Sequence, residues 1–303
     1  MRQASGEQWT IAAEGHEAVV VEIGGGLRTY AVDGVPLLDG YGREELCPAY
    51  AGALLAPWPN RIRDGRYNFD GRSYRLPLTE PERHNAIHGL VAWARWHATK
   101  SAADEVTVEH EVPPQPGYPW ALALSATYAV GASGLRAEHH VTNVDTQPCP
   151  FGFSVHPYLL AGAGVPEVLL SVPARSRLLL DGRLLPIGAA KVAGTEYDFT
   201  APRQVGALEL DTAFGDLIRA DDKAPTEVTL STSDGRGVAI WADASFGWWQ
   251  IFTADTLAGE RRRRSIAVEP MTCPPDAFRS GRDLVTLEPG QAWRGAWGIR
   301  PLG

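Results

Sequence analysis

Two runs of alternating apolar and polar residues, ALALSATYAV (residues 121–130) and LRAEHHVTNV (residues 135–144), are joined by Gly131-Ala-Ser-Gly134. An alternation of period two is the pattern of a β-strand that buries one face. A short connection rich in glycine is typical of a hairpin. The stretch therefore predicts a long antiparallel hairpin. His139 and His140 are adjacent in the second strand, so only one can face the core, and we interpret both as structural.

Similar short runs follow one another along the rest of the chain. The 32 Gly and 23 Pro are scattered between them, which indicates turns rather than disorder. Helical periodicity is confined to residues 43–55 and 202–208. Many strands without alternating helices indicate an all-β fold, a large antiparallel β-sandwich, and we expect one domain over residues 1–303. Further strands are predicted at residues 18–23, 27–32, 106–112, 168–172, 177–180, 227–231, 238–241, 248–252, 266–269 and 293–299.

The charge and hydropathy of the chain argue against several function classes. It has 28 Lys and Arg against 36 Asp and Glu, a net charge of −8, whereas nucleic acid requires a basic face. The one basic run, Arg261–Arg264, is interpreted as a solvated loop between strands. No apolar run approaches the roughly 20 residues that span a bilayer, and residues 1–20 lack the apolar core of a signal peptide. We expect a protein with no nucleic-acid or membrane partner.

The three cysteines, Cys47, Cys149 and Cys273, are far apart in the chain. Their number is odd, and no CxxC or His-Cys cluster is present, so neither a disulfide framework nor a zinc site is predicted. This usage fits a reducing compartment, and we expect a cytoplasmic location. Cys273 is interpreted as a buried thiol.

The stretch SIAVEPMTCPP (residues 265–275) carries the most informative carboxylate. A short apolar run leads to Glu269, and prolines follow at once. A proline biases the preceding residue toward an extended backbone and removes a donor from the ladder. We therefore expect Glu269 at the end of a strand, where a pocket can use its carboxylate. The alternative is a structural Glu-Pro turn at a strand exit.

Arg61 and His88 are two further candidates. Arg61 precedes a predicted hairpin in which Tyr67 and Phe69 alternate before an Asp-Gly turn, and its guanidinium is suited to binding hydroxyl or carbonyl oxygens. His88 is followed by Gly89, whose lack of a side chain permits a close approach. The alternatives are a surface salt-bridge partner for Arg61 and a structural histidine at position 88.

His156 and Asp211 complete the set. His156 precedes a proline within FGFSVHPY (residues 151–158), so an imidazole lies among aromatic residues, where it can act as a general acid or base. Asp211 lies in a loop-like context and is otherwise a turn or cap residue. The run Trp248–Phe252 adds aromatic surface and one amide, which suit either a pyranose ring or a core.

Taken together, these stretches resemble the aldose 1-epimerase (galactose mutarotase) family over nearly the whole chain. Four stretches carry the resemblance in order, with LDTAF (residues 210–214) as a weaker fifth. They are NRI (60–62) with Gly65, Tyr67, Phe69 and Gly71, then NAIHG (85–89), SVHPY (154–158) and VEPMT (268–272).

The resemblance implies a large antiparallel β-supersandwich that acts on a sugar. It implies that Glu269 is the general base and His156 the general acid of ring opening, and that no metal or organic cofactor takes part. It also implies three residues that bind and orient the sugar, namely Arg61, His88 and Asp211. The sequence leaves open whether the protein is a monomer or a homodimer.

One departure leaves the substrate open. The segment around His156 is more similar to divergent bacterial branches of the family, including those that handle modified hexoses. An anionic hexose, a 6-phosphate or a sulfonate, is therefore the main alternative to a neutral one, with Arg63, Arg66 and Arg83 as candidate cations. Two further hypotheses are a non-catalytic sugar-binding sandwich and a glycoside hydrolase that uses Glu269 and Asp211.

Overall fold

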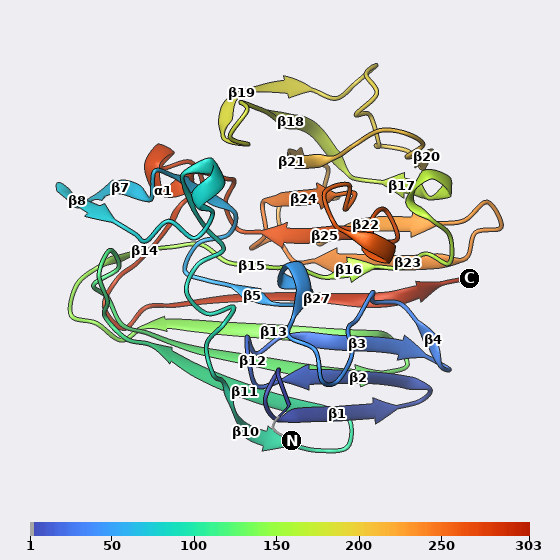
Figure 1. Ribbon diagram of the computed structural model, residues 1–303, viewed down its shortest axis with the longest axis horizontal. Helices are drawn as coiled ribbons and strands as arrows, with labels where there is room; N and C mark the ends of the chain where they lie inside the picture. Colours follow the sequence, from blue (N-terminus) through green and yellow to red (C-terminus); the bar gives the residue numbers. More distant parts are fainter. Residues whose placement is uncertain (1–2) are drawn as a thin grey trace.

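The computed structural model describes residues 3–303 and consists mainly of antiparallel strands (Figure 1). The predicted hairpin is formed by β12 (Leu122–Gly131) and β13 (Gly134–Asn143), which pair along their whole length. Buried residues alternate with half-buried ones along β12, as the period-two pattern predicts. His139 is buried and accepts a hydrogen bond from Trp297 (Nε1–Nε2 2.8 Å), so its structural interpretation is supported.

This hairpin is part of a nine-stranded sheet in which every neighbouring pair is antiparallel. The predicted closing strand, β27, lies beside β13 and joins the hairpin to the second half of the sheet. The order is β10 (His97–Ser101), β11 (Glu105–Val112), β12, β13, β27 (Ala292–Leu302), β23 (Gly237–Ala242), β22 (Thr226–Ser231), β17 (Leu169–Ser171) and β20 (Arg203–Gln204).

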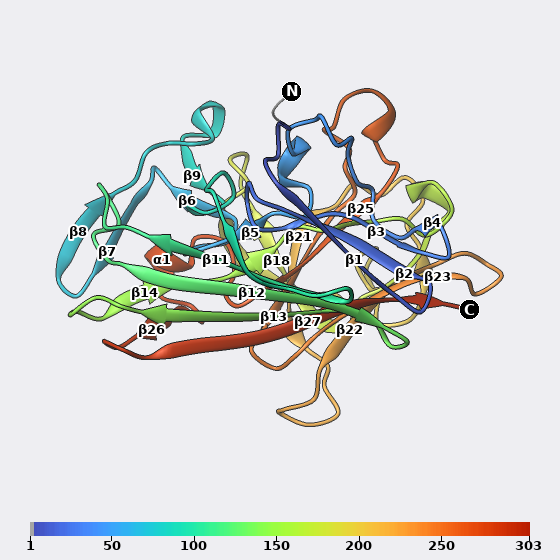
Figure 2. The same ribbon diagram turned by 90° about the horizontal axis from the view of Figure 1, so that it is seen from below.

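A second, eight-stranded sheet faces the first, and a four-stranded sheet packs on β11–β13 (Figure 2). The eight-stranded sheet runs β19 (Pro186–Lys191), β18 (Ala174–Leu180), β21 (Asp211–Leu217), β24 (Trp248–Phe252), β25 (Ile266–Met271), β15 (Ser154–Val155) and β5 (Leu54–Leu55), and β16 (Tyr158–Leu159) also pairs with β25. The four-stranded sheet contains β1 (Gln8–Ala13), β2 (His16–Val21), β3 (Leu27–Val32) and β4 (Val35–Pro36).

Small ribbons and short helices complete the fold. The ribbons are β6 (Arg61–Arg63) with β9 (Asn85–Ile87), β7 (Arg66–Phe69) with β8 (Arg72–Arg75), and β14 (Cys149–Phe151) with β26 (Val285–Leu287). The helices are the 3₁₀ turns η1 (Pro48–Tyr50), η2 (Pro81–Arg83), η3 (Val165–Glu167) and η4 (Gly259–Arg261), and α1 (Ala277–Ser280). No helix within residues 3–303 has the length and apolar character needed to cross a membrane.

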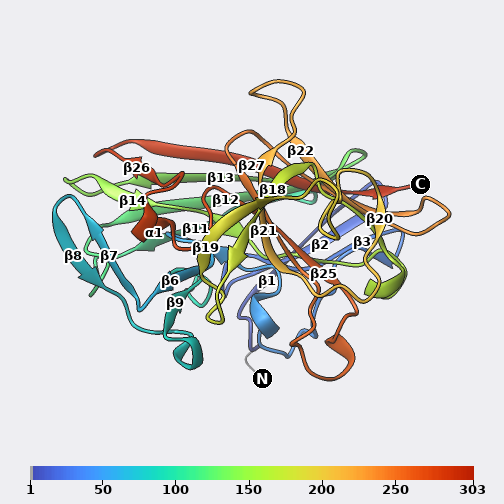
Figure 3. The same ribbon diagram turned by 90° about the horizontal axis from the view of Figure 1, so that it is seen from above.

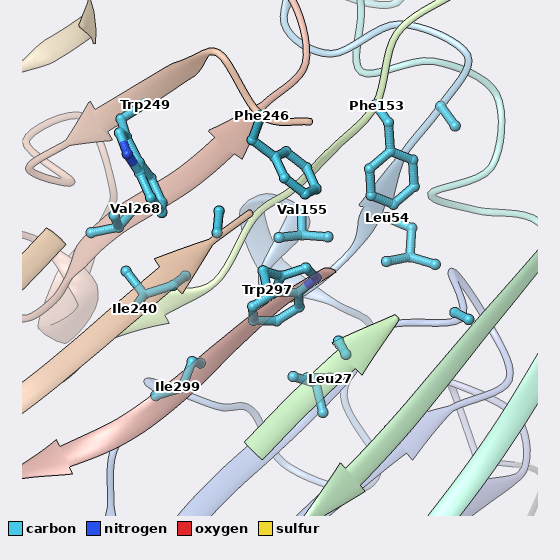
Figure 4. Close-up of a cluster of buried hydrophobic side chains, with 14 of the residues drawn as sticks. Leu27, Leu54, Phe153, Val155, Ile240, Phe246, Trp249, Val268, Trp297 and Ile299 are labelled. Atoms are coloured by element: carbon cyan, nitrogen blue, oxygen red, sulfur yellow. The ribbon is translucent and has the colours of Figure 1, made fainter. Parts of the chain in front are cut away.

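The main core lies between the nine-stranded sheet and the strands that face it (Figure 4). Trp297 of β27 is 2% exposed and lies among side chains from several strands, including Val155, Ile240 and Val268. All three cysteines are buried and free, and the buried thiol predicted at Cys273 is confirmed. Antiparallel sheets that enclose an aromatic and aliphatic core confirm the predicted all-β sandwich.

Of the two regions in which helical turns were predicted, one contains such a turn and the other does not. Residues 43–55 contain the 3₁₀ turn η1 and the strand β5, and the turn does not extend because Ala49 and Tyr50 adopt left-handed backbone angles (φ 47° and 60°) that a right-handed helix cannot continue. Residues 202–208 contain the short strand β20, because the segment pairs with β17 at the edge of the large sheet. In this second region, strand pairing outweighs the local sequence pattern.

Glu269 does not lie at a strand exit as predicted. β25 continues through Pro270 to Met271, which pairs with Trp248 on one side and with Ser154 on the other. A proline removes one donor but keeps a backbone angle that a strand tolerates. The carboxylate is therefore held inside the sheet rather than at its end.

The core predicts a stability difference between two apolar truncations. Trp297→Ala removes a large buried ring and the hydrogen bond to His139, so we expect the free energy of unfolding to fall by roughly 3–5 kcal/mol. Ile187→Ala is the control, because Ile187 is 67% exposed, and we expect a change within about 0.5 kcal/mol. Urea denaturation measures both, and equal midpoints for the two variants would contradict the assignment of Trp297 to the core.

Candidate active site

Three strands of the eight-stranded sheet place polar side chains on the face that points away from the main core. In β25, Val268 belongs to the main core, so the next residue, Glu269, points to the opposite face. Gln250 of β24 is the register partner of Glu269. Asp211 is the first residue of β21, not a loop residue as predicted, and it accepts a hydrogen bond from Gln250 (Nε2–Oδ1 2.5 Å). The alternation of the strands thus gathers these groups on one face.

His156 reaches the same face from the connection between β15 and β16, both of which pair with β25. Its backbone N–H donates to the Ala53 carbonyl (3.1 Å), and its carbonyl accepts from the Gly52 N–H (2.8 Å). The imidazole Nε2 lies 3.4 Å from Oε1 of Glu269, and the two side chains are only 7% and 3% exposed. The predicted acid and base are therefore neighbours in a buried environment.

Burial dominates the titration of this pair. Desolvation, followed by the charge of Asp211, raises the pKa of Glu269 well above its ordinary value, and Arg61 opposes this. Desolvation lowers the pKa of His156 to about 4; a backbone hydrogen bond opposes the shift, and Arg61 adds to it. Both shifts favour the uncharged groups. The pair therefore holds one proton over a wide pH range, with the carboxyl as its preferred site.

Arg61 is held between two carboxylates. Its guanidinium binds Glu80 through two nitrogens (Nε–Oε2 2.9 Å, Nη2–Oε1 3.1 Å), and Nη1 lies 3.6 Å from Oδ2 of Asp211. Glu80 also accepts hydrogen bonds from Arg83 (3.0 Å) and Asn85 (2.8 Å). Burial raises the pKa of Glu80, but the hydrogen bonds and charge of Arg61 outweigh it and hold that pKa below its usual range. The positive charge of Arg61 is thus neutralised by the adjacent carboxylates of Glu80 and Asp211.

Glu80 was missed from the sequence, although it precedes a proline as Glu269 does. The same signal, a carboxylate directly before a proline, could have identified it. Gln250 was noted only as an amide within an aromatic run. Its role emerges from the strand register, which places it against Glu269.

His88 lies next to His156, with ring centroids 5.4 Å apart, and it is buried. Desolvation, with smaller contributions from His156 and Arg61, lowers its pKa well below the usual value, so the ring is neutral. Its backbone is left-handed (φ 62°), a conformation that few residues other than glycine adopt. Gly89 continues this turn against the carbonyl of Ala56, which confirms the close approach expected from the sequence.

These groups line a cavity of about 330 Å³. All five predicted site residues, Arg61, His88, His156, Asp211 and Glu269, are on its wall. Aromatic side chains complete the wall. The ring centroid of Tyr50 lies 4.6 Å from that of His88 and 6.4 Å from that of His156. The wall thus combines polar groups with flat apolar surfaces, as a site for a sugar requires.

Unpartnered buried polar atoms are concentrated around this cavity, on three of its wall residues and on Gln250, the register partner of Glu269. In the part of the chain that the structure describes, seven buried side-chain nitrogen or oxygen atoms lack a hydrogen-bond partner, and four of them belong to the site. These four are Nδ1 of His88, Nδ1 of His156, Oε1 of Gln250 and Oε2 of Glu269. Buried polar atoms are ordinarily paired, so this concentration favours a ligand that supplies hydroxyl groups.

The remaining predicted cations have different surroundings. Only Arg83 lines the cavity; Arg63 pairs with Asp181 (3.2 Å), and Arg66 lines a separate groove. No group of three or more His, Cys, Asp or Glu side chains with the arrangement of a metal site exists within residues 3–303.

The basic run Arg261–Arg264 lies in the loop between β24 and β25, as predicted, but three of its four arginines make ion pairs there. Arg261 and Arg264 pair with Asp39, which is 4% exposed, and Arg263 pairs with Asp255. A buried carboxylate requires a cation, which is the physical reason for the run. These ion pairs anchor the loop that brings residues 256 and 257 to the wall of the cavity.

A family model described as Aldose 1-epimerase matches residues 7–300. The chain belongs to the aldose 1-epimerase family. Among curated proteins, it is 34% identical to YihR of Escherichia coli K12, which is described as uncharacterized, over 96% of this chain and 92% of that protein. It is also 30% identical to galactose mutarotase of Rattus norvegicus, over 56% of this chain and 50% of that enzyme.

Solved structures show the same fold. An aldose epimerase homologue from C. elegans superposes with a TM-score of 0.85 at 20% identity, covering 98% of this chain and 99% of that one. Galactose 1-epimerase from Lactobacillus acidophilus superposes with a TM-score of 0.80, also at 20% identity, covering 96% and 93%. The galactose mutarotase-like architecture implied by the resemblance is therefore confirmed.

The turn after His88 predicts a position-dependent response to alanine. Gly89 and Gly71 have nearly equal angles (φ 71° and 70°), but a Cβ at Gly89 would lie 2.1 Å from the Ala56 carbonyl oxygen, whereas one at Gly71 would meet nothing within 4 Å. We expect Gly89→Ala to destabilise this epimerase-family protein by roughly 1–3 kcal/mol more than Gly71→Ala. Thermal and urea unfolding measure the difference, and equal losses would show that no close approach exists at Gly89.

Proposed function

We propose that this protein is a mutarotase that interconverts the α and β anomers of a free neutral hexose. One observation carries the proposal: the carboxyl of Glu269 and the imidazole of His156 lie 3.4 Å apart on the wall of a cavity, and each has a buried polar atom without a partner. Family membership supports the reaction class.

The proposed reaction begins with the charged form of the pair. Ionised Glu269 takes the proton of the C1 hydroxyl, and protonated His156 gives its proton to the ring oxygen as the bond between C1 and that oxygen breaks. The products are the open-chain aldehyde, a neutral carboxyl and a neutral imidazole. After rotation about the C1–C2 bond, the reverse transfers close the ring on the other face. Each positioned proton transfer is worth ~10²–10⁴-fold in rate.

Burial of the pair suits this sequence of steps. The raised pKa of Glu269 and the lowered pKa of His156 favour the neutral pair, which accompanies the open-chain sugar. The open-chain form is itself the less stable form of a hexose. The two preferences oppose each other, so neither ring opening nor ring closure becomes strongly uphill. Two groups with opposite shifts are also the usual basis for a separate acid and base.

The remaining groups of the site are assigned to binding. Asp211 is on the cavity wall, where its carboxylate can accept from sugar hydroxyls, and the hydrogen bond that Gln250 donates to it holds it in place. His88 is neutral and has one unpartnered ring nitrogen. Arg61 fixes Asp211 and supplies a positive potential that opposes further elevation of the pKa of Glu269. No metal or organic cofactor is needed for any of these steps.

The charge of the cavity supports a neutral sugar over an anionic one. Its two lining cations, Arg61 and Arg83, each have carboxylates within ion-pair distance: Glu80 and Asp211 for the first, Glu80 and Glu82 for the second. A phosphate or sulfonate in this cavity would have to compete with those carboxylates for both cations. The charges of the cavity therefore do not favour an anionic substrate.

The ionisable group paired with Glu269 is the imidazole of His156, and this argues against two alternative functions, a glycosidase and a non-catalytic sugar-binding protein. A glycosidase needs two carboxyl groups on either side of the bond that breaks, whereas Asp211 is engaged by Arg61 and Gln250. A protein that only binds sugar gains nothing from a buried acid–base pair, which has a desolvation cost. Both arguments favour proton transfer by Glu269 and His156 over the two alternative functions.

Substitution of either member of the pair tests the proposal. We expect Glu269→Gln and His156→Asn each to lower kcat by roughly 10²–10⁴-fold, with KM changed much less, because each removes a proton transfer made in the transition state. Polarimetry of freshly dissolved α-glucose and α-galactose measures the rate after subtraction of spontaneous mutarotation. His140→Asn, on β13 outside the cavity, is the matched control. Wild-type rates in both site variants would refute the mechanism.

The shared proton predicts a bell-shaped dependence of kcat/KM on pH. As pH falls toward about 4, the pKa of His156, the pair gains a second proton and no base remains. As pH rises above the raised pKa of Glu269, the pair loses its last proton and no acid remains. The acid limb should therefore lie well below the ordinary histidine range.

The alkaline limb offers a sharper test through Asp211. Its negative charge is the second cause of the raised pKa of Glu269, so we expect Asp211→Asn to move the alkaline limb to lower pH. Asp216→Asn is the control, because Asp216 is on the same strand but its side chain is 63% exposed. The kcat/KM profiles of the three proteins measure the limb, and a limb unmoved by Asp211→Asn would contradict the electrostatic coupling.

A further inference from the structure

The β7–β8 hairpin lies beside α1 at one end of the molecule (Figures 1 and 3). Residues of this hairpin and Arg279 of α1 line a groove of about 610 Å³. It shares no lining residue with the candidate active site. Its volume is in the range of cavities that hold small molecules. Three arginines line it, Arg66, Arg75 and Arg279, with Asp64 as the one acidic group of the wall.

The three arginines have no carboxylate partner. Within residues 3–303, none of them makes an ion pair or a side-chain hydrogen bond, whereas Asp64 is already bound to Arg183 (Oδ1–Nη2 2.8 Å). That hydrogen bond, first among several causes, holds the pKa of Asp64 below its usual value. The groove is therefore cationic in a chain whose net charge is −8.

The hairpin register brings two of these charges together. Arg66 and Arg75 are directly opposite each other in the β7–β8 pair. Like charges at opposed positions of a ladder are unfavourable, so the arrangement does not serve the stability of the hairpin. The neighbouring pair on the same face is Asn68 and Ser73, joined by a hydrogen bond in which the Ser73 hydroxyl donates to Oδ1 of Asn68 (2.7 Å). The amide N–H groups of Asn68 have no partner in the described chain.

We propose that this groove binds a tetrahedral oxyanion, the phosphate or sulfate group of a small molecule. Arginine presents a planar fork of donors that matches such oxygens in pairs, and the amide of Asn68 adds further donors. An anion at this place would also remove the repulsion between Arg66 and Arg75. The groove is separate from the proposed sugar cavity, so this proposal does not depend on the mutarotase assignment.

The hairpin supplies its own matched control. Arg72 pairs with Phe69, so it points from the opposite face of the same ribbon, and it does not line the groove. Arg66→Gln/Arg75→Gln removes two of the three groove cations. Since this double variant also relieves the like-charge pair, we expect its melting temperature to equal or exceed that of the wild type, so a loss of binding would not reflect unfolding.

Calorimetric titration of the whole protein in low salt, without sugar, tests the proposal with inorganic phosphate, sulfate and pyrophosphate as probes. We expect binding to the wild type and to Arg72→Gln, a loss of at least tenfold in affinity in Arg66→Gln/Arg75→Gln, and weakening as chloride is added. Glycerol 3-phosphate distinguishes the two sources of the group: tighter binding than phosphate indicates an ester, and equal binding indicates the free ion. No binding to the wild type, or equal binding to all three proteins, would overturn the proposal.

Discussion

Desolvation of the Glu269–His156 pair is the constraint on which the rest of the site depends. β25 is buried on both faces, so a carboxyl on it has little contact with water, and burial favours its uncharged form. The imidazole of His156 lies next to this carboxyl, and the backbone of His156 is fixed by hydrogen bonds to residues 52 and 53. The sheet thus fixes both the distance between the two groups and their preference for the neutral form.

The charges around the pair are arranged so that this proton is retained. Arg61 lowers the pKa of both Glu269 and His156, so an unbalanced cation at this position would tend to strip the pair of its proton. Glu80 and Asp211 flank the guanidinium and offset it, while Asn85 and Arg83 hold Glu80 in place. The carboxylates around Arg61 therefore act on the chemistry through electrostatics as well as through the position of the side chain.

Local pattern predicted much of this molecule, but it had clear limits. Period-two alternation located the hairpin β12–β13 and most of the long strands, because each has one face in the core. The five site residues came from motif resemblance, and the structure brings all five to one cavity. Glu80 and Gln250 were missed because their roles come from contacts between distant segments, which alternation does not record. The helical turn predicted within residues 43–55 is limited to η1, because Ala49 and Tyr50 have left-handed backbone angles that the local pattern does not reveal.

The arginines of residues 61–66 illustrate why charge composition alone could not identify the substrate. Arg61 is neutralised within the cavity, Arg63 is paired with Asp181 outside it, and Arg66 faces the groove after the turn at residues 64 and 65. A surplus cation beside Glu269 and His156 would lower both pKa values and oppose the shared proton, so acid–base chemistry of this kind requires a balanced cavity. A groove away from Glu269 and His156 can hold unpaired arginines without changing the pKa of either group. The pairing of Arg61 with carboxylates therefore fits the proton that the buried pair keeps, whereas Arg66, which faces the groove, needs no such partner.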